Sequence, residues 1–302
     1  MVVTRRDFLK ATSAIAAALG LRSLSSQEAF GAEGAQSVVW LQAQGCTGCS
    51  VSLLNSIYYA TIDDLLLNSL DLNYHPTVMA AAGDLAISAA QAALEGPGGY
   101  VLVVEGAIPM ANQGRYCYLW PGMTAFEGVK EFSRKAGFIL AVGTCAAYGG
   151  MPAGRPNPTG ARSVESALGG TPVINIPGCP AHPDWIVGTI VHLLTYGKAP
   201  RLDNDGRPTA YFGRKIHEQC PLQKRSKAGD CALTLSEDGC LKRLGCNGRQ
   251  TRSDCPIRQW NSGAAGAYGV NWCIGARNPC QGCTEPGFPD SMSPFYTEME
   301  GR

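Results

Sequence analysis

Cysteine is the residue with the most chemistry to offer in this sequence, because 13 of the 302 residues are cysteine. An odd number of cysteines cannot all pair in disulfides, and a chain of this length does not need disulfides to fold. Several of them follow short apolar segments in glycine-containing motifs, such as Gly45-Cys46-Thr47-Gly48-Cys49. Metal binding is therefore the first explanation to consider.

Four cysteines in the first two thirds of the chain follow predicted buried strands. Cys46 and Cys49 come after the first strand, and Cys145 and Cys179 come after two later ones. The carboxyl ends of parallel strands share one edge of a sheet, so these four thiols are expected to meet there. Four thiolates fit a [4Fe–4S] cluster or a structural zinc ion. Zinc ligands usually come in local pairs, so the distant loops favour iron–sulfur over zinc or over unligated buried thiols.

The last third of the chain offers two further sets of four candidate ligands. Each set could hold one cluster. The first set contains His217, Cys220, Cys240 and Cys246, and the second contains Cys255, Cys273, Cys280 and Cys283. Spacing alone does not fix this partition. His217 is a candidate only because it completes a set that is otherwise one ligand short. A neutral imidazole in place of a thiolate would raise the potential of its cluster. Cys117 and Cys231 are left as buried small hydrophobic residues.

Alternating apolar strands and amphipathic helices must position these residues. The predicted strands cover residues 38–41, 100–104, 138–142 and 172–176. The predicted helices cover residues 50–60, 84–95, 126–136 and 183–196. Continuous apolar strands that alternate with helices are typical of an α/β fold with a parallel sheet covered on both faces.

The pattern changes near residue 200. Residues 201–302 contain 13 Gly, 7 Pro and 8 Cys, with little sustained periodicity. Such a segment cannot build a conventional core, but bound clusters can organise it because ligand binding energy becomes folding energy. We therefore expect one domain over residues 35–200 and a second, irregular one over residues 201–302.

The charge balance excludes some partners. The chain has 25 Lys and Arg against 24 Asp and Glu, and this balance argues against a nucleic-acid binder, which would normally be more basic. Between Arg214 and Arg258 there are 10 basic and 5 acidic residues. That local excess fits either the steering of an acidic redox partner or the compensation of cluster charge at a solvated surface.

The N-terminus reads as an export signal. Arg5-Arg6 precedes an apolar run from Ala11 to Leu21, which is typical of a twin-arginine signal over residues 1–34. An ordinary signal peptide or an amphipathic anchor is the alternative. Twin-arginine export carries folded proteins, which suits a chain loaded with metal in the cytoplasm. No other apolar run approaches the roughly 18 residues of a membrane span, so we expect a periplasmic mature chain without one.

Along essentially its whole length, the sequence resembles the small subunit of nickel–iron hydrogenases. The segments that carry the resemblance are Arg5-Arg6, Cys46-Thr47-Gly48-Cys49-Ser50, Gly143-Thr144-Cys145-Ala146, Pro177-Gly178-Cys179-Pro180, His217-Glu218-Gln219-Cys220 and Cys280-Gln281-Gly282-Cys283-Thr284-Glu285-Pro286. The resemblance implies a flavodoxin-like doubly wound sheet followed by an irregular iron–sulfur domain.

The resemblance also implies three [4Fe–4S] clusters and assigns their ligands. Those of the proximal cluster are Cys46, Cys49, Cys145 and Cys179; those of the medial cluster are Cys255, Cys273, Cys280 and Cys283; those of the distal cluster are His217, Cys220, Cys240 and Cys246. A nickel–iron centre in a separate large subunit would make or split hydrogen. This chain would pass electrons to a soluble acceptor, a c-type cytochrome, and would contribute no catalytic acid or base.

Departures from the family pattern refine the expectation. Many relatives have proline where this chain has Cys273, and their medial cluster is [3Fe–4S]. Cys273 and the non-acidic Val51 both resemble the nickel–iron–selenium branch. Gly48 and Gly150 stand where oxygen-tolerant relatives carry extra cysteines, so a six-cysteine proximal cluster is not expected.

Two other functions would share part of this sequence pattern. The cluster subunit of a quinone-reducing respiratory complex would resemble the first half of the chain, but it should lack the export signal and the eight-cysteine second half. A secreted zinc or disulfide protein without redox activity would share the export signal, but the odd cysteine count disfavours it.

Overall fold

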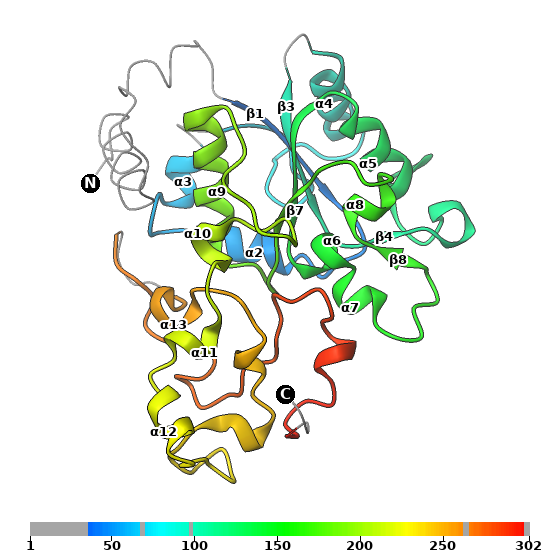
Figure 1. The fold of residues 1–302 in the computed structure, drawn as a ribbon. Coiled ribbons are helices and arrows are strands. Elements are labelled where there is room, and N and C mark those ends of the chain that lie inside the picture. Colours follow the sequence, from blue (N-terminus) through cyan, green and yellow to red (C-terminus); the bar gives the residue numbers. More distant parts are fainter. Residues whose placement is uncertain (1–35, 67–69, 97–98, 262–265, 299–302) are drawn as a thin grey trace.

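The computed structural model describes residues 36–66, 70–96, 99–261 and 266–298 (Figure 1). The predicted export signal over residues 1–34 lies outside the described residues. Among the residues that are described, no helix is long and apolar enough to cross a membrane.

A five-stranded parallel sheet forms the centre of the first part of the chain. Its strands are β1 (Gln36–Gln42), β2 (Leu70–Tyr74), β3 (Tyr100–Glu105), β7 (Ala136–Val142) and β9 (Ile174–Ile176). They lie in the order β2-β1-β3-β7-β9, and every neighbouring pair is parallel. This is the flavodoxin-type strand order, so the predicted doubly wound α/β fold is confirmed.

Helices cover both faces of the sheet because successive strand residues point to opposite sides. Val38 and Trp40 of β1 belong to one core cluster, together with residues of α2 (Gly48–Leu54) and α9 (Pro183–Tyr196). Val39 and Leu41 belong to the other, with residues of α4 (Asp84–Glu95) and α5 (Ala125–Ser133). All six residues of β3 are buried, as expected for a strand covered on both faces.

Local sequence signals fix several helix ends. Thr124 and Glu127 form a capping box at the start of α5, in which the Thr124 hydroxyl accepts the Glu127 N–H at 3.2 Å. At the start of α9, His182 Nδ1 accepts the Asp184 N–H at 3.1 Å and Pro183 occupies the first turn. The helix ends at Gly197, which adopts a left-handed conformation.

Shorter elements connect the sheet strands. The remaining helices of this part are α3 (Ile62–Asp64), α6 (Thr144–Tyr148), α7 (Gly150–Ala153), α8 (Val164–Ala167) and the 3-10 helix η2 (Ala111–Gly114). Two small antiparallel pairs are formed by β4 (Ile108–Pro109) with β8 (Ala161–Arg162) and by β5 (Tyr118–Trp120) with β6 (Met123–Thr124).

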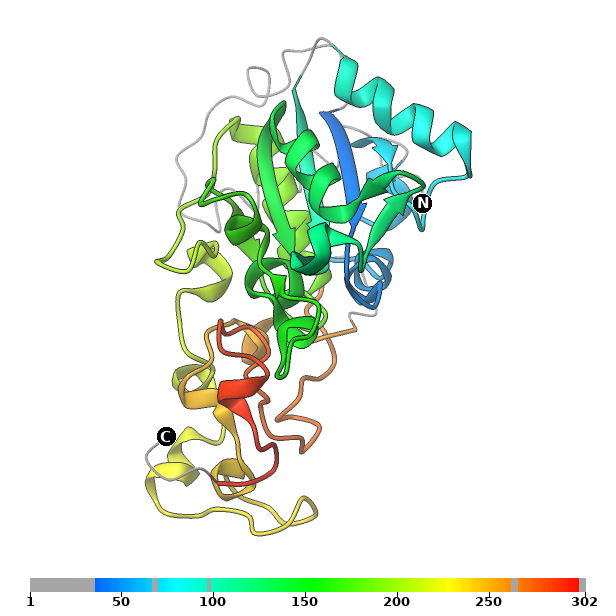
Figure 2. The same cartoon turned by 90° about the vertical axis from the view of Figure 1, so that its right-hand side faces the viewer.

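The part of the chain beyond residue 200 has only short helices among its described residues, and it lies beneath the sheet in Figures 1 and 2. They are α10 (Thr209–Phe212), α11 (Ile216–Gln219), α12 (Gln223–Lys227), α13 (Cys255–Arg258), and the 3-10 helices η3 (Leu241–Leu244), η4 (Asn247–Arg249) and η5 (Asp290–Met292). A small third core joins Ile216, Leu241, Trp272 and Ile274 to the Cys280 side chain. Cysteine is thus part of the packing here.

Two buried arginines lie near the junction of the two parts, and Arg258 links the parts directly. Arg258 pairs with Asp184 of α9 at 3.0 Å and with Asp254 at 2.8 Å. Its guanidinium also lies 5.2 to 5.9 Å from the ring centroids of four tyrosines, Tyr58, Tyr59, Tyr211 and Tyr268. Arg207 pairs with Asp203 and Asp205 at 2.8 Å, and with Glu285 at 3.1 Å. Removing one partner from either buried network would leave an uncompensated charge. The Arg258 pairs therefore hold the junction in one arrangement, and the Arg207 pairs hold the loop at residues 203–207 against Glu285 within the second part.

Candidate metal centres

The four thiols predicted to meet at the sheet edge do so. Cys46 and Cys49 follow β1, Cys145 lies in α6 after β7, and Cys179 follows β9. Desolvation is the main cause that raises the pKa of Cys49, and the charges of Glu105, Cys145 and Cys179 raise it further. Desolvation and the charges of Cys179 and Cys46 raise the pKa of Cys145 to about 11. The four sulfurs therefore share one electrostatic environment.

Glycines make room for this set of thiols. A Cβ on Gly143 would lie only 2.5 Å from Cys49 Sγ, and a Cβ on Gly48 would lie 3.0 Å from Cys46 Sγ. Gly143 also has φ +85°, a conformation that L side chains rarely adopt. Gly150 has φ +48°, and a Cβ there would lie 2.8 Å from the Cys145 nitrogen. The backbone thus approaches the sulfurs more closely than any other residue type would allow.

A buried carboxylate anchors the first cysteine loop. Glu105, at the carboxyl end of β3, is 4% exposed and accepts the backbone N–H groups of Cys49 at 2.9 Å and Ser50 at 3.2 Å. It also accepts the Trp40 indole N–H at 3.1 Å and the Ser50 hydroxyl. Glu105 therefore fixes the position of α2 and places a negative charge beside the thiols.

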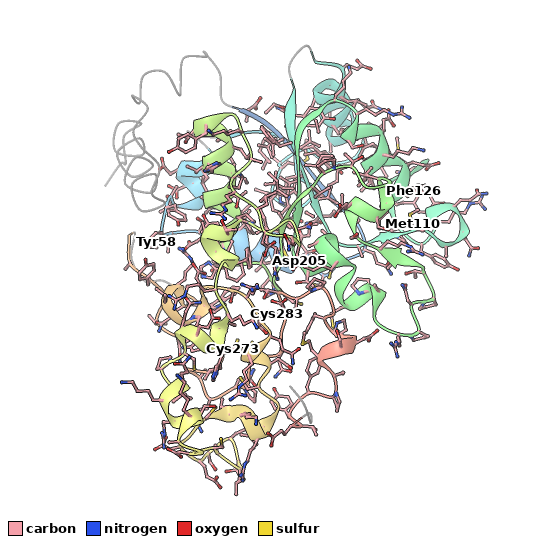
Figure 3. All side chains as sticks on the ribbon, viewed as in Figure 1. Tyr58, Met110, Phe126, Asp205, Cys273 and Cys283 are labelled. Carbon is pink, nitrogen blue, oxygen red and sulfur yellow. The ribbon has the colours of Figure 1, made fainter. Side chains whose placement is uncertain are left out.

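The second set brings together Cys255, Cys273, Cys280 and Cys283 in the later part of the chain. The charges of Cys283 and Cys273 both act on the buried Cys255 thiol, whose pKa is raised mainly by burial. Burial and the charge of Cys273 raise the pKa of Cys283 to about 12. Burial again raises the pKa of Cys280, and Cys246 and Cys283 add to the effect. Figure 3 labels Cys273 and Cys283 in this lower part.

The third set lies farther from the sheet. The pKa of the Cys246 thiol is raised by burial and then by the charges of Cys240 and Cys220. His217 lies on α11, half-buried, and its pKa is lowered by desolvation and by the charges of Arg249 and Lys227. Its imidazole would therefore be neutral near pH 7, as a ligand must be.

The two leftover cysteines differ from expectation. Cys117 and Cys231 are half-buried, so the prediction that both are buried is wrong. Cys117 follows the turn at Gly114 and precedes a partly exposed two-stranded ribbon. Cys231 lies beside Cys240, because the two residues pair in an isolated parallel bridge and their thiols interact. The structure thus adds one thiol to the neighbourhood of the third set.

The three sets adjoin one another in series. The Cys179 backbone N–H lies beside the Cys283 sulfur, which links the second set to the first. The Cys280 backbone N–H lies beside the Cys246 sulfur, and the Asn247 N–H donates to the Cys280 carbonyl at 2.8 Å, which links the third set to the second. Thr144 strengthens the first junction, since its hydroxyl accepts the Gly178 N–H at 2.8 Å and donates to the Cys283 carbonyl. A continuous covalent and hydrogen-bonded path therefore runs from the sheet edge to the far end.

The donor chemistry fits iron–sulfur clusters. All thirteen cysteines are free thiols, and the first two sets consist of thiols alone. Several of these sulfurs accept backbone N–H groups, as Cys145 does from Met151 and Cys280 from Gly282. Hydrogen bonds to sulfur are a common feature of such sites. Among the described residues, no three His, Cys, Asp or Glu side chains come close enough to hold a single metal ion.

Sequence reasoning missed the charged residues that position the thiols. Glu105 is the last residue of a fully buried strand, at the same edge of the sheet as the cysteine loops. A charged residue at that position could have been predicted from the sequence to lie beside the thiols. Arg258 and Arg207 had no such signal, because only tertiary contact shows that their charges are buried.

Known proteins match both parts of the chain. Residues 46–193 match a family model described as NADH ubiquinone oxidoreductase, 20 Kd subunit. Residues 212–296 match a second family model, which describes the C-terminal part of the NiFe/NiFeSe hydrogenase small subunit. The second match covers the part that the quinone-reducing rival was expected to lack.

Relatives match nearly the whole chain. The periplasmic [NiFeSe] hydrogenase small subunit of Desulfomicrobium baculatum is 42% identical, over 98% of this chain and 99% of its own length. The periplasmic [NiFe] hydrogenase small subunit of Solidesulfovibrio fructosivorans is 41% identical, over 98% of this chain and 93% of its own. A solved structure of the Dm. baculatum [NiFeSe]-hydrogenase matches with a TM-score of 0.81 at 42% identity, over 88% of this chain and 99% of that one.

These likenesses extend over both the sheet and the thiol-rich part, so fold and motifs point to one family. The chain belongs to the small subunits of nickel–iron and nickel–iron–selenium hydrogenases, which are electron-transferring partners in a heterodimeric enzyme.

Proposed function

We propose that this chain holds three [4Fe–4S] clusters in series and connects the hydrogen-converting centre of a large subunit to an external electron acceptor. The proximal ligands are Cys46, Cys49, Cys145 and Cys179; the medial ligands are Cys255, Cys273, Cys280 and Cys283; the distal ligands are His217, Cys220, Cys240 and Cys246. The observation that carries the proposal is the serial contact of the three sets, through Cys179 with Cys283 and through Cys280 with Cys246.

When bound, such clusters supply one-electron transfer, in either direction between hydrogen and the acceptor. The residues of this chain do the rest. Burial and backbone N–H donors fix the environment of each sulfur, and the buried Glu105 and Arg258 networks keep the loops rigid. No residue of the chain is assigned a catalytic proton transfer.

Cys273 supports a four-iron medial cluster. Its charge acts on both Cys255 and Cys283, so four thiols are available at that site. We assign the chain to the nickel–iron–selenium branch on this residue, because 42% and 41% identity do not separate the two branches.

The large subunit would dock on the face that carries the proximal thiols. Cys46 and Cys179 are exposed there, and a pocket of about 320 Å³ adjoins them, lined by Gly48, Val51 and Trp260 among others. Apolar side chains are exposed around it, with Val51 at 53% and Val270, next to the pocket residue Gly269, at 73%. A partner that covers the exposed thiols, the pocket and these two apolar side chains fits this docking face.

We further propose that the mature chain acts in the periplasm after twin-arginine export, and that its acceptor is a soluble c-type cytochrome. Periplasmic relatives and the Arg5-Arg6 pair support the location.

Metal analysis of the anaerobically purified heterodimer tests the proposal. We expect about twelve irons with matching sulfide in this chain, and nickel in the co-purifying large subunit. His217→Ala should lower the iron content or destabilise the distal cluster signal, whereas Cys231→Ser, which removes the neighbouring thiol, should keep all the iron. Zinc without sulfide would mean that the cysteines have a structural role. If Cys231→Ser loses iron and His217→Ala does not, then Cys231 and not His217 is the fourth distal ligand.

A further inference from the structure

The end of the molecule that carries the distal set is basic. Helix α12 carries Lys224 and Lys227, and Arg249 lies in η4. All three side chains are exposed, and among the described residues none of them forms an ion pair. In Figure 1 this end lies opposite the sheet.

Two of these three cations lie near His217, which the acidic Glu218 also neighbours. The charges of Arg249 and Lys227 both act on the His217 imidazole. Arg249 Nη2 donates to the Ser226 hydroxyl at 3.3 Å, which holds the guanidinium against α12. Helix α12 also packs on α11, the helix that carries His217.

The acidic residues of the same end are mostly engaged locally. Asp230 pairs with Arg225 at 2.6 Å and Glu298 with Lys242 at 3.3 Å. The Glu218 carboxylate accepts the Lys215 N–H at 3.0 Å, and Glu237 accepts the Leu233 N–H at 2.8 Å. Asp238 is exposed and acts on the already paired Arg225. The exposed carboxylates of Glu218, Glu237 and Asp238 keep their negative charge, but the exposed cations that form no ion pair with a described residue are more numerous, so this end carries a net positive charge. Those cations are Lys224, Lys227, Arg243 and Arg249.

We propose that Lys224, Lys227 and Arg249 form a docking surface for an electron-carrier protein with an acidic face. The inference rests on the proposed function, because it takes the distal set as the place where electrons leave or enter. Compensation of cluster charge would not require side chains that extend into solvent. Exposed charges of one sign do steer and orient an oppositely charged partner, and they do so less at high ionic strength.

Binding to the anaerobic holoenzyme tests this surface. The probes are an acidic and a basic c-type cytochrome, each titrated against the immobilised heterodimer at low and high salt. We expect the acidic probe to bind more tightly and to lose affinity with salt. Changing Lys224, Lys227 and Arg249 together to glutamine should weaken that binding about tenfold, from the sum of three exposed charge contacts.

A matched control uses three exposed cations on the sheet domain. Changing Lys130, Arg134 and Lys135 to glutamine removes the same charge from around α5 and should leave binding of the acidic probe unchanged. Equal effects of the two triple variants, or tighter binding of the basic probe, would overturn the docking surface. Iron content and hydrogen oxidation with a small-molecule acceptor are measured on the same samples. Their loss in the unmodified enzyme would instead overturn the proposed function.

Discussion

At the scale of single residues, the proposed four-iron medial cluster depends on Cys273. Its charge acts on Cys255 and Cys283, so it belongs to the same set, yet its side chain is exposed. Cys273→Pro should leave three thiols and convert a [4Fe–4S] cluster to [3Fe–4S]. We expect a stoichiometric [3Fe–4S] electron paramagnetic resonance signal in the oxidised variant and the loss of about one iron per chain.

The half-buried Cys117 provides the control for that substitution. It lies in no set, so Cys117→Ser should change neither the iron content nor the resonance spectrum. A stoichiometric [3Fe–4S] signal already present in the unmodified enzyme would contradict the role given to Cys273.

His75 should make stability depend on pH. It is fully buried, stacks on Trp40 with ring centroids 4.9 Å apart, and has Nε2 3.3 Å from the Ser50 hydroxyl. Burial lowers its pKa from 6.5 to about 4. Below about pH 6.5 His75 is protonated in the unfolded chain but stays neutral in the folded chain. The folded protein is therefore most stable above that pH, and its free energy of unfolding decreases as the pH falls towards 4.

Between pH 7.5 and pH 5 the protonation of His75 in the unfolded chain lowers the free energy of unfolding by about 2 kcal/mol, or the melting temperature by roughly 5 °C. His75→Gln removes the titration, so its melting temperature should fall about that much less than the wild type's over the same interval. Thermal melts of both heterodimers at the two pH values measure it. Parallel shifts in the two proteins would show that His75 contributes no pH dependence.

At the scale of elements, the loop after β7 depends on Gly143. Its φ of +85° and the 2.5 Å distance that would separate an added Cβ from Cys49 Sγ both exclude a side chain. Gly122 has almost the same φ, +84°, but a Cβ there would meet nothing within 4 Å. The two positions therefore separate backbone strain from contact with the sulfur.

Gly143→Ala should displace Cys49 and lower the iron content by up to about four atoms per chain. Gly122→Ala should lose only about 1–2 kcal/mol of stability from the left-handed backbone and keep its iron. Iron and sulfide analysis with thermal melts distinguishes them. Full iron in Gly143→Ala would mean that the loop can shift without releasing the sulfur.

The elements predicted best from the sequence are those whose residue pattern follows directly from burial in the core. Helices 84–95 and 183–196 coincide with α4 and α9, and the four apolar strands are all present. The helix predicted over residues 50–60 is wrong in extent, because α2 runs from Gly48 to Leu54 and the chain then turns, with the Ser56 hydroxyl donating to the Ala60 carbonyl at 2.8 Å. The helix predicted to residue 136 ends at Ser133, since Ala136 already pairs in the sheet.

Other features had no sequence pattern to reveal them. The edge strand β2 was not predicted, because Leu70–Tyr74 is half polar and only its pairing with β1 makes it a strand. The cysteine motifs did predict the convergence at the sheet edge, since strand ends fix it. The serial contact of the three sets depends on how the irregular part packs under the sheet, which no spacing encodes.

At the scale of the whole molecule, the two ends of the thiol path face different surroundings. The proximal end opens on an apolar face with exposed thiols, and the distal end opens on a basic surface. Apolar contact favours a permanent partner, whereas exposed charge favours a brief encounter that salt weakens. This asymmetry fits a stable large subunit at one end and an exchanging carrier at the other.

The last prediction concerns the apolar face beside the proximal thiols. Val270 is 73% exposed beside the pocket near the proximal thiols, and Leu85 is 74% exposed on α4, which covers the opposite side of the sheet. Val270→Arg would bury an unpaired charge if the large subunit docks there, which costs enough to weaken assembly by at least about tenfold. Leu85→Arg adds the same charge at equal exposure and should leave assembly intact. Nickel that co-purifies with the tagged small subunit measures the heterodimer, and equal nickel in both variants would place the large subunit on another face.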